Sequence, residues 1–110
     1  PKPIRDYLYI EDFIDLILCL LNTKKSSEGI FNIGSGQSHS NLEVAQIIQT
    51  LASPSSQIKI LSKPRKNDIS LCTINNQKIK NHLNWNPKYN LSEGLNHILE
   101  KISKTDIIKN

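Results

Sequence analysis

Two arginines are the side chains of this sequence best suited to bind a ligand. Arg5 and Arg65 are the only arginines among fourteen basic residues, and a carboxylate follows each at a short interval, Asp6 and Asp68. A planar guanidinium can hold a phosphate by two parallel hydrogen bonds, which an ammonium cannot. Arginine in a lysine-biased chain therefore indicates a position where lysine would not serve. Ordinary salt bridges explain the same spacing, and from spacing alone they are the preferred explanation.

A glycine-containing turn suggests dinucleotide binding as a second possible chemistry. Gly34, Ser35 and Gly36 follow a predicted strand and precede a predicted helix, as such turns do. The dinucleotide fingerprint also requires a small residue three positions after the second glycine, where His39 stands. The predicted helix begins several residues too late as well. We therefore expect a turn without a bound pyrophosphate, and no cofactor-binding residue is assigned.

The three histidines give no metal-binding pattern. Structural zinc sites usually show ligand pairs at short spacing. None of the histidines forms such a pair with a cysteine or a carboxylate on one helix face: His39, His82 and His97. No metal-binding residue is therefore assigned.

Two further residue pairs have simpler structural explanations. Asp12 and Asp15 stand three apart in a predicted helix and could mimic a catalytic carboxylate pair. Acidic residues near a helix start stabilise the helix dipole, which explains them without catalysis. Cys19 and Cys72 have no CxxC or metal-type neighbour, so we expect buried free thiols.

Size and charge limit the class of protein. The chain has 110 residues, 37% of them hydrophobic, which permits one domain with a modest core. No apolar run approaches the roughly 20 residues that span a bilayer, and no secretion signal is recognised. We therefore expect a cytoplasmic protein without a membrane anchor. Residues 56–110 hold ten basic residues against four carboxylates, a charge of +6. Solvated lysines are the preferred explanation, and an anionic partner is the alternative.

Alternating strand and helix patterns indicate an α/β fold that would position these side chains. Strands are expected at three stretches rich in β-branched or aromatic residues: 4–10, 30–33 and 58–61. Helices are expected where apolar residues recur at helical spacing: 11–21, 40–53, 75–84 and 90–102. Ser40 with Glu43 and Asn90 with Glu93 fit capping boxes, and Asn75 fits a helix cap.

Five motifs together resemble a known family. They occur in this order: Arg5 to Asp12 (RDYLYIED), Gly29 to Gly36 (GIFNIGSG), Arg65 to Asp68 (RKND), Leu83 to Pro87 (LNWNP) and Leu91 to Leu95 (LSEGL). Over about residues 4–100, this order and spacing resemble the C-terminal portion of NAD-dependent nucleotide-sugar epimerases and dehydratases. These are extended short-chain dehydrogenase/reductases, of which UDP-glucose 4-epimerase is a familiar member. Each motif is weak alone, and together they are a strong signal.

The resemblance implies roles for three residues. In the family, the arginines of the first and third motifs grip the diphosphate of the sugar nucleotide, which would assign that role to Arg5 and Arg65. The aspartate that closes the third motif, here Asp68, places the nucleoside or orients the arginines. Trp85 and Pro87 resemble structural packing residues. The expected substrate-binding residues therefore position the substrate and carry no chemistry themselves.

Three positions depart from the family pattern, and each holds an asparagine. Asn67 replaces a glycine of the arginine motif, and Asn84 replaces a glycine before the tryptophan. Asparagine tolerates positive φ at both positions. Asn75 replaces an aspartate that opens the following helix, and it remains a competent cap.

Other family features are missing from this sequence. The family's N-terminal glycine-rich turn for NAD is absent, and so is its catalytic Tyr-x-x-x-Lys. The residues four positions after the three tyrosines are Glu11, Phe13 and Glu93. We therefore expect residues 1–104 to be a C-terminal substrate-binding region that lacks the nucleotide-binding Rossmann half, and 105–110 to be a frayed tail. The sequence contains no methionine, which truncation also explains.

The predicted function follows from this combination. We expect the substrate-binding fragment of an NAD-dependent nucleotide-sugar epimerase of the UDP-sugar 4-epimerase type, which is inactive alone and binds no NAD. A 4,6-dehydratase or reductase of the same family and a non-catalytic nucleotide-sugar-binding module are alternatives. Nucleic-acid binding by the lysine-rich half is the weakest alternative, since only 5% of residues are aromatic. The strand expected at 30–33 would join the absent Rossmann sheet, so an exposed edge and apolar face could drive self-association.

Overall fold

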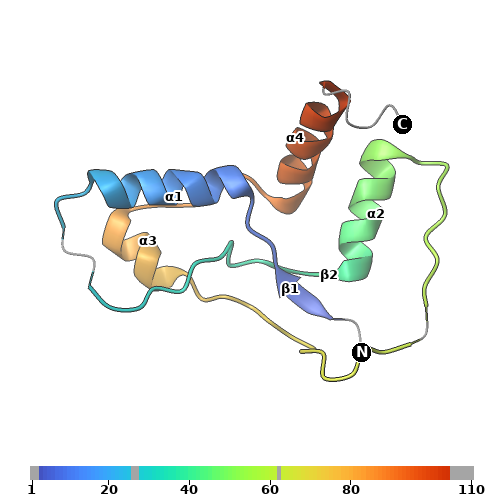
Figure 1. The fold of residues 1–110 in the computed structure, drawn as a ribbon, viewed down its shortest axis with the longest axis horizontal. Helices are drawn as coiled ribbons and strands as arrows, with labels where there is room; N and C mark the ends of the chain where they lie inside the picture. Colours follow the sequence, from blue (N-terminus) through green and yellow to red (C-terminus); the bar gives the residue numbers. More distant parts are fainter. Residues whose placement is uncertain (1–2, 26–27, 62, 105–110) are drawn as a thin grey trace.

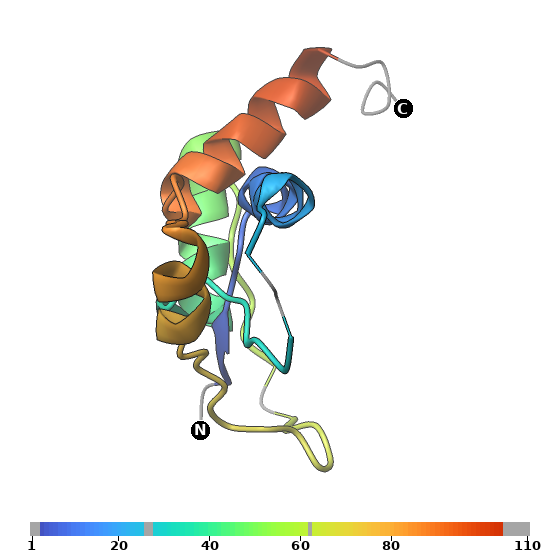
Figure 2. The ribbon, with the colours of Figure 1, turned by 90° about the vertical axis from the view of Figure 1, so that its left-hand side faces the viewer.

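Four helices and a two-stranded sheet make up the computed structural model, which describes residues 3–25, 28–61 and 63–104. The helices are α1 (Ile10–Asn22), α2 (Asn41–Ala52), α3 (Gln77–Leu83) and α4 (Leu91–Lys104). Strands β1 (Ile4–Asp6) and β2 (Ser38–Ser40) pair antiparallel between α1 and α3 on one side and α2 and α4 on the other (Figure 1). The molecule is thin, with extents of 50, 37 and 19 Å (Figure 2). The expected α/β fold with about four helices is confirmed for the described residues.

Only part of the first predicted strand is confirmed. β1 ends at Asp6 because the chain enters α1 at Ile10, so the strand prediction over 7–10 is wrong. The described residues of 58–61 form no strand either. That stretch lies in the long loop after α2, where Ile60 and Leu61 are exposed (71% and 73%). A β-branched run without a neighbouring strand has no ladder to join, which explains the wrong prediction.

Residues 30–33 form no strand in this structure, and that they join a Rossmann sheet stays a prediction. This segment has no ladder partner among the described residues, and side chains hold its backbone instead. The Lys78 ammonium donates to the Ile30 carbonyl at 2.8 Å, and the Asn76 amide donates to the Gly34 carbonyl at 2.9 Å. The strand that pairs with β1 is β2, whose Ser-His-Ser sequence gives no strand signal.

Helix starts follow the predicted caps. The Ser40 hydroxyl accepts from the Glu43 N–H at 3.2 Å, and the Glu43 carboxylate accepts from the Ser40 N–H at 2.6 Å. This reciprocal pair is the predicted capping box at the start of α2. At α4, the Asn90 side chain accepts from the Glu93 N–H at 2.8 Å, which confirms the capping role of Asn90.

Of the three asparagines that depart from the family pattern, Asn67 and Asn84 adopt the expected conformation, whereas the N-cap of α3 is Asn76 and not the predicted Asn75. The Asn75 side chain accepts from the N–H of Gln77, the first residue of α3, at 3.0 Å. Asn84 ends α3 in the left-handed conformation with φ of 52°. Asn67 also has positive φ, 60°. Both positions where asparagine replaces a family glycine therefore use the conformation that asparagine tolerates best after glycine.

The hydrophobic core of the described residues is small. Leu16 of α1, Ile79 of α3 and Trp85 form its buried centre. Partly buried apolar residues pack around it: Leu8, Leu20, Phe31, Ile33 and Leu83. The packing role expected for Trp85 is confirmed, since this side chain is 5% exposed.

The side of α1 that faces away from this core is apolar and exposed. Six residues at helical spacing make up this α1 outer face: Ile10, Phe13, Ile14, Ile17, Leu18 and Leu21. Cys19 is exposed as well, and Cys72 is half-buried; both are free. The expectation of two buried thiols is therefore wrong for both cysteines.

Asp12 has a larger structural role than the helix-dipole effect expected for it. Its side chain is fully buried, and its two carboxylate oxygens accept from the N–H groups of Lys88 at 2.9 Å and Tyr89 at 3.1 Å. The carboxylate thereby joins the first turn of α1 to the segment that leads into α4. A buried charge is tolerated here because backbone donors compensate it.

Replacing Asp12 with alanine should lower the free energy of unfolding by about 3 kcal/mol, because two backbone N–H groups lose their acceptor. Urea unfolding followed by circular dichroism measures this change. Asp15→Ala is the matched control, since Asp15 lies on the same helix and makes a more exposed salt bridge with Lys88. The control should cost much less, because solvent screens this exposed pair. Equal losses in the two variants would contradict the role of Asp12.

Candidate functional site

The segment that follows Asp68 is attached to the first strand. The Ile4 N–H donates to the Ser70 carbonyl, and the Ile4 carbonyl accepts from the Cys72 N–H, both at 2.9 Å. These bonds form a parallel bridge between Ile4 and Leu71. β1 therefore has β2 on one edge and residues 70–72 on the other, which brings the first and third motifs together.

Arg5 and Asp68, 63 residues apart in the sequence, form a salt bridge. The Arg5 Nη2 atom lies 2.6 Å from the Asp68 Oδ1 atom, and Nη1 donates to the Ile4 carbonyl at 2.9 Å. Their side chains are 28% and 29% exposed. A guanidinium has five N–H donors, and these two contacts use two of them. The remaining donors can bind an anion from solvent while Asp68 fixes the plane of the guanidinium.

Arg65 lies in the exposed loop that ends at Asp68. Its Cα is at most about 11 Å from that of Asp68, because the two residues are three positions apart in the chain. The described residues offer Arg65 no hydrogen bond or salt bridge. The structure therefore brings Arg5 and Asp68 into contact, and it leaves Arg65 nearby on a loop that Asn67 bends with its positive φ.

Asp6, next to Arg5, binds the glycine-containing turn. Its Oδ1 atom accepts from the N–H of Ser35 at 2.7 Å and from the Ser35 hydroxyl at 2.8 Å. Its Oδ2 atom accepts from the N–H of Gly36 at 2.9 Å. Gly36 has φ of 77°, a conformation that favours glycine. The turn is thus closed by a carboxylate from β1.

This turn does not fit a dinucleotide. A pyrophosphate would need the backbone N–H groups that Asp6 already occupies, and a carboxylate there would repel it. Helix α2 begins only at Asn41, five residues after Gly36, so its N-terminus is not part of the turn. That no residue of this turn binds NAD stays a prediction.

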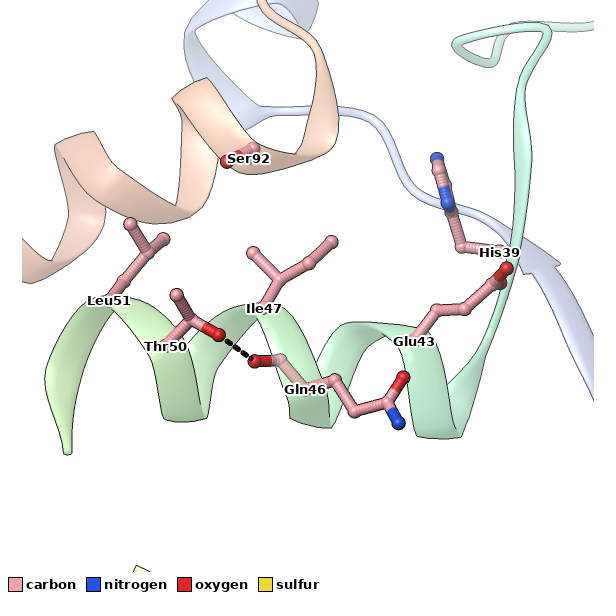
Figure 3. A pocket seen from close by; sticks show the side chains of 7 residues that line it. All are labelled: His39, Glu43, Gln46, Ile47, Thr50, Leu51 and Ser92. Atoms are coloured by element: carbon pink, nitrogen blue, oxygen red, sulfur yellow. Dashed lines mark hydrogen bonds between the residues drawn. The ribbon is translucent and has the colours of Figure 1, made fainter. Parts of the chain in front are cut away.

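An open cleft lies between α2 and α4 (Figure 3). Its volume is about 360 Å³, and α2 side chains make up most of its lining, with His39 and Ser92 at its borders. Ile47 and Leu51 point across it toward α4 (Figure 3). A second, more polar cleft of about 280 Å³ includes Tyr7 and His39. Neither cleft is lined by Arg5, Arg65 or Asp68.

Shifted pKa values occur away from the arginines. The pKa of Glu11 is lowered, and that of Lys101 is raised, chiefly by the hydrogen bond that joins α1 to α4 through these two side chains. The pKa of Lys88 is raised, chiefly by its hydrogen bond to Asp15. All three groups are exposed, and their pairs fasten α1 to the last part of the chain. They are structural salt bridges rather than acid–base groups of a site.

The described part of the chain holds no metal cluster and no membrane span. No group of three or more His, Cys, Asp or Glu side chains comes together there. No helix of the described residues is long and apolar enough to cross a bilayer.

Two site-shaping residues were missed by sequence reasoning. From the sequence, Asp6 is only a carboxylate beside Arg5, and Asp12 is only a residue near a helix start. Their partners are backbone N–H groups of loops 29 to 77 residues away, which have no side-chain signature in a sequence. The one available signal was that both carboxylates lie in the first of the five motifs.

Comparison with known proteins identifies the fold first. The structure superposes on part of a UDP-glucose 4-epimerase from Thermotoga maritima solved with UDP-glucose, with a TM-score of 0.83 and 27% identity. The match covers 94% of this chain and 32% of that one. A dTDP-glucose 4,6-dehydratase from Bacillus anthracis in complex with NAD matches with a TM-score of 0.77 and 28% identity, over 96% of this chain and 33% of that one. The fold is part of an extended short-chain dehydrogenase/reductase.

Sequence comparison then identifies the family. The family model described as GDP-mannose 4,6 dehydratase matches residues 1–98. UDP-glucuronic acid decarboxylase 1 from Arabidopsis thaliana is 32% identical over 102 residues, which cover 86% of this chain and 21% of the relative. The chain belongs to the family of NAD-dependent nucleotide-sugar epimerases and dehydratases. It spans about a fifth to a third of the length of the relatives it matches.

Proposed function

We propose that this chain binds the diphosphate of a nucleotide sugar through Arg5 and Arg65, with Asp68 as the residue that orients Arg5. The observation that carries the proposal is the 2.6 Å salt bridge between Arg5 and Asp68. It joins the two arginine motifs in a chain whose family acts on nucleotide sugars. A partly exposed guanidinium on β1, with a second one on the loop that ends at Asp68, suits an anionic ligand. The domain assignment, residues 1–104 as a substrate-binding region, is part of the same proposal.

The type of reaction is the finer part of the proposal. We favour an epimerase that acts on a UDP-sugar at C4, supported by the similarity to a UDP-glucose 4-epimerase solved with UDP-glucose. A 4,6-dehydratase is the alternative, and the relatives also include decarboxylases. The reaction would use NAD held by a Rossmann half of the kind that family members carry. A cytoplasmic location is proposed as well, supported by two free cysteines.

The exposed α1 outer face supports the proposal that a Rossmann half packs against this chain. Six apolar side chains on one helix face form a surface that water solvates poorly. The segment at 30–33 lies in the same half of the molecule, and its Ile30 is 83% exposed. We propose that a Rossmann half covers this surface, and that isolated copies of the chain bury it against one another.

UDP should bind the 110-residue chain, and Arg65→Ala should weaken that binding by about tenfold or more. The variant loses charge-assisted hydrogen bonds of about 1.5–3 kcal/mol. Calorimetric titration measures the dissociation constant, and uridine, which lacks phosphates, should bind far more weakly than UDP. Because Arg65 has no partner among the described residues, its replacement should leave the unfolding temperature unchanged.

Lys66→Ala is the matched control for Arg65→Ala, since it removes one positive charge from the same loop. It should raise the dissociation constant about twofold, because a screened neighbouring charge contributes less than a bidentate contact. Equal effects of the two variants, with tight and strongly salt-dependent binding of short oligonucleotides, would favour the nucleic-acid alternative.

The 110-residue chain should show no turnover with UDP-glucose and NAD. Asp6 occupies the N–H groups of the glycine-containing turn, and the chain has no Tyr-x-x-x-Lys. NMR of the sugar detects epimerisation or dehydration, and NADH absorbance detects trapped hydride. Measurable conversion of the sugar would show that the chain holds a complete active site.

The chain should self-associate in a concentration-dependent way through the α1 outer face. Leu18→Gln should shift sedimentation-velocity profiles toward monomer, because it places an amide in the apolar contact. Ile60→Gln is the control, since Ile60 is 71% exposed but lies in the loop after α2. A wild-type chain that sediments as a clean monomer at high concentration would contradict this expectation.

A further inference from the structure

We infer that Asp6 is a positioning residue for Arg5: by binding the glycine-containing turn, it fixes the register in which β1 presents the guanidinium to the ligand. The inference rests on the proposed function, because it concerns the same diphosphate contact. Asp6 itself would not contact the ligand.

Arg5 and Asp6 are neighbours on β1, so their side chains leave opposite faces of the strand. On one face the guanidinium meets Asp68. On the other face the Asp6 carboxylate accepts three hydrogen bonds from Ser35 and Gly36. The Asp6 carboxylate therefore anchors one face of β1 to the turn, while the other face presents the Arg5 guanidinium.

The ladder around β1 is too short to fix its own register. β1 and β2 have three residues each, and a single bridge at Ile4 adds the third segment. Two-stranded pairs of this length are marginal in water. A slip of one residue would turn every side chain of β1 to the opposite face, which would remove Arg5 from Asp68.

The bonds of Asp6 specify one register. In it, Arg5 lies opposite His39, and Asp6 lies opposite Ser38, two residues beyond the turn that Asp6 binds. Hydrogen bonds to an ionised acceptor are about twice as strong as neutral ones. Asp6 accepts three such hydrogen bonds at 2.7 to 2.9 Å, and together they outweigh any preference of the short β1–β2 ladder for another register.

Asp6→Asn tests the inference, because losing the negative charge of Asp6 and losing the fixed position of Arg5 have opposite expected effects on UDP binding. The variant removes a negative charge beside Arg5, so charge alone would strengthen UDP binding. Loss of the fixed position of Arg5 would weaken UDP binding. An asparagine side chain has one acceptor oxygen and cannot replace both carboxylate oxygens of Asp6. We expect the dissociation constant for UDP to rise about tenfold, equivalent to about 1.4 kcal/mol. Asp15→Asn, which removes a negative charge from α1, should change it less than about twofold.

A second readout does not depend on the ligand. In the wild-type chain, the bonds of Arg5 to Asp68 and to the Ile4 carbonyl should restrict guanidinium rotation and give separate Nη signals in NMR. In Asp6→Asn these signals should merge while the helical circular dichroism is kept. Should Asp6→Asn not fold, Ser35→Ala removes one of the three bonds, and it should change both readouts in the same direction by a smaller amount.

The outcomes separate the two proposals. If wild-type chain shows the restricted Arg5 signals, and Asp6→Asn loses them without any UDP binding in either chain, the proposed function fails and the positioning role holds. If UDP binds and Asp6→Asn leaves both the dissociation constant and the Arg5 signals unchanged, or strengthens binding, the positioning role is overturned. An unchanged Ser35→Ala variant would count against it in the same way.

Discussion

Carboxylates that accept backbone N–H groups hold this molecule together. Asp6 joins β1 to the turn before β2, and Asp12 joins α1 to the segment before α4. Among the described residues, the hydrophobic core has three buried side chains at its centre, and the molecule is only 19 Å thick. Apolar burial alone therefore specifies little of the arrangement. The two carboxylates supply long-range contacts that position the turn before β2 and the segment before α4. Both stand in the first twelve residues, and the remaining elements are arranged around them.

Local features could be predicted from the sequence because their causes are local. The starts of α2 and α4 follow from Ser40 with Glu43 and from Asn90. The helices themselves follow from apolar spacing, since each needs only its own residues to satisfy its backbone. The positive φ of Asn67 and Asn84 follows from the family glycines that they replace.

Strands were predicted poorly because a strand exists only where a partner lies beside it. The β-branched runs at 30–33 and 58–61 have the composition of strands, but no described segment pairs with them. β2 has no such composition, yet it pairs with β1 because the turn at Gly36 directs it there. The candidate site divides in the same way. Residue types and the family resemblance single out Arg5, Arg65 and Asp68. The 2.6 Å contact between Arg5 and Asp68, 63 residues apart, depends on the tertiary structure and has no signature in the sequence.

The assembly of β1 has a consequence for the order of folding. Its two neighbours are residues 38–40 and 70–72. Each of them is separated from β1 by more than thirty residues of chain, and this chain must fold back before the ladder bonds can form. Closing such loops costs conformational entropy that the helices never face, because their bonds span four residues. Contacts between residues close in the sequence need less loop closure than contacts of high separation. We therefore expect the surface that carries Arg5 and Asp68 to be completed after the helices around it.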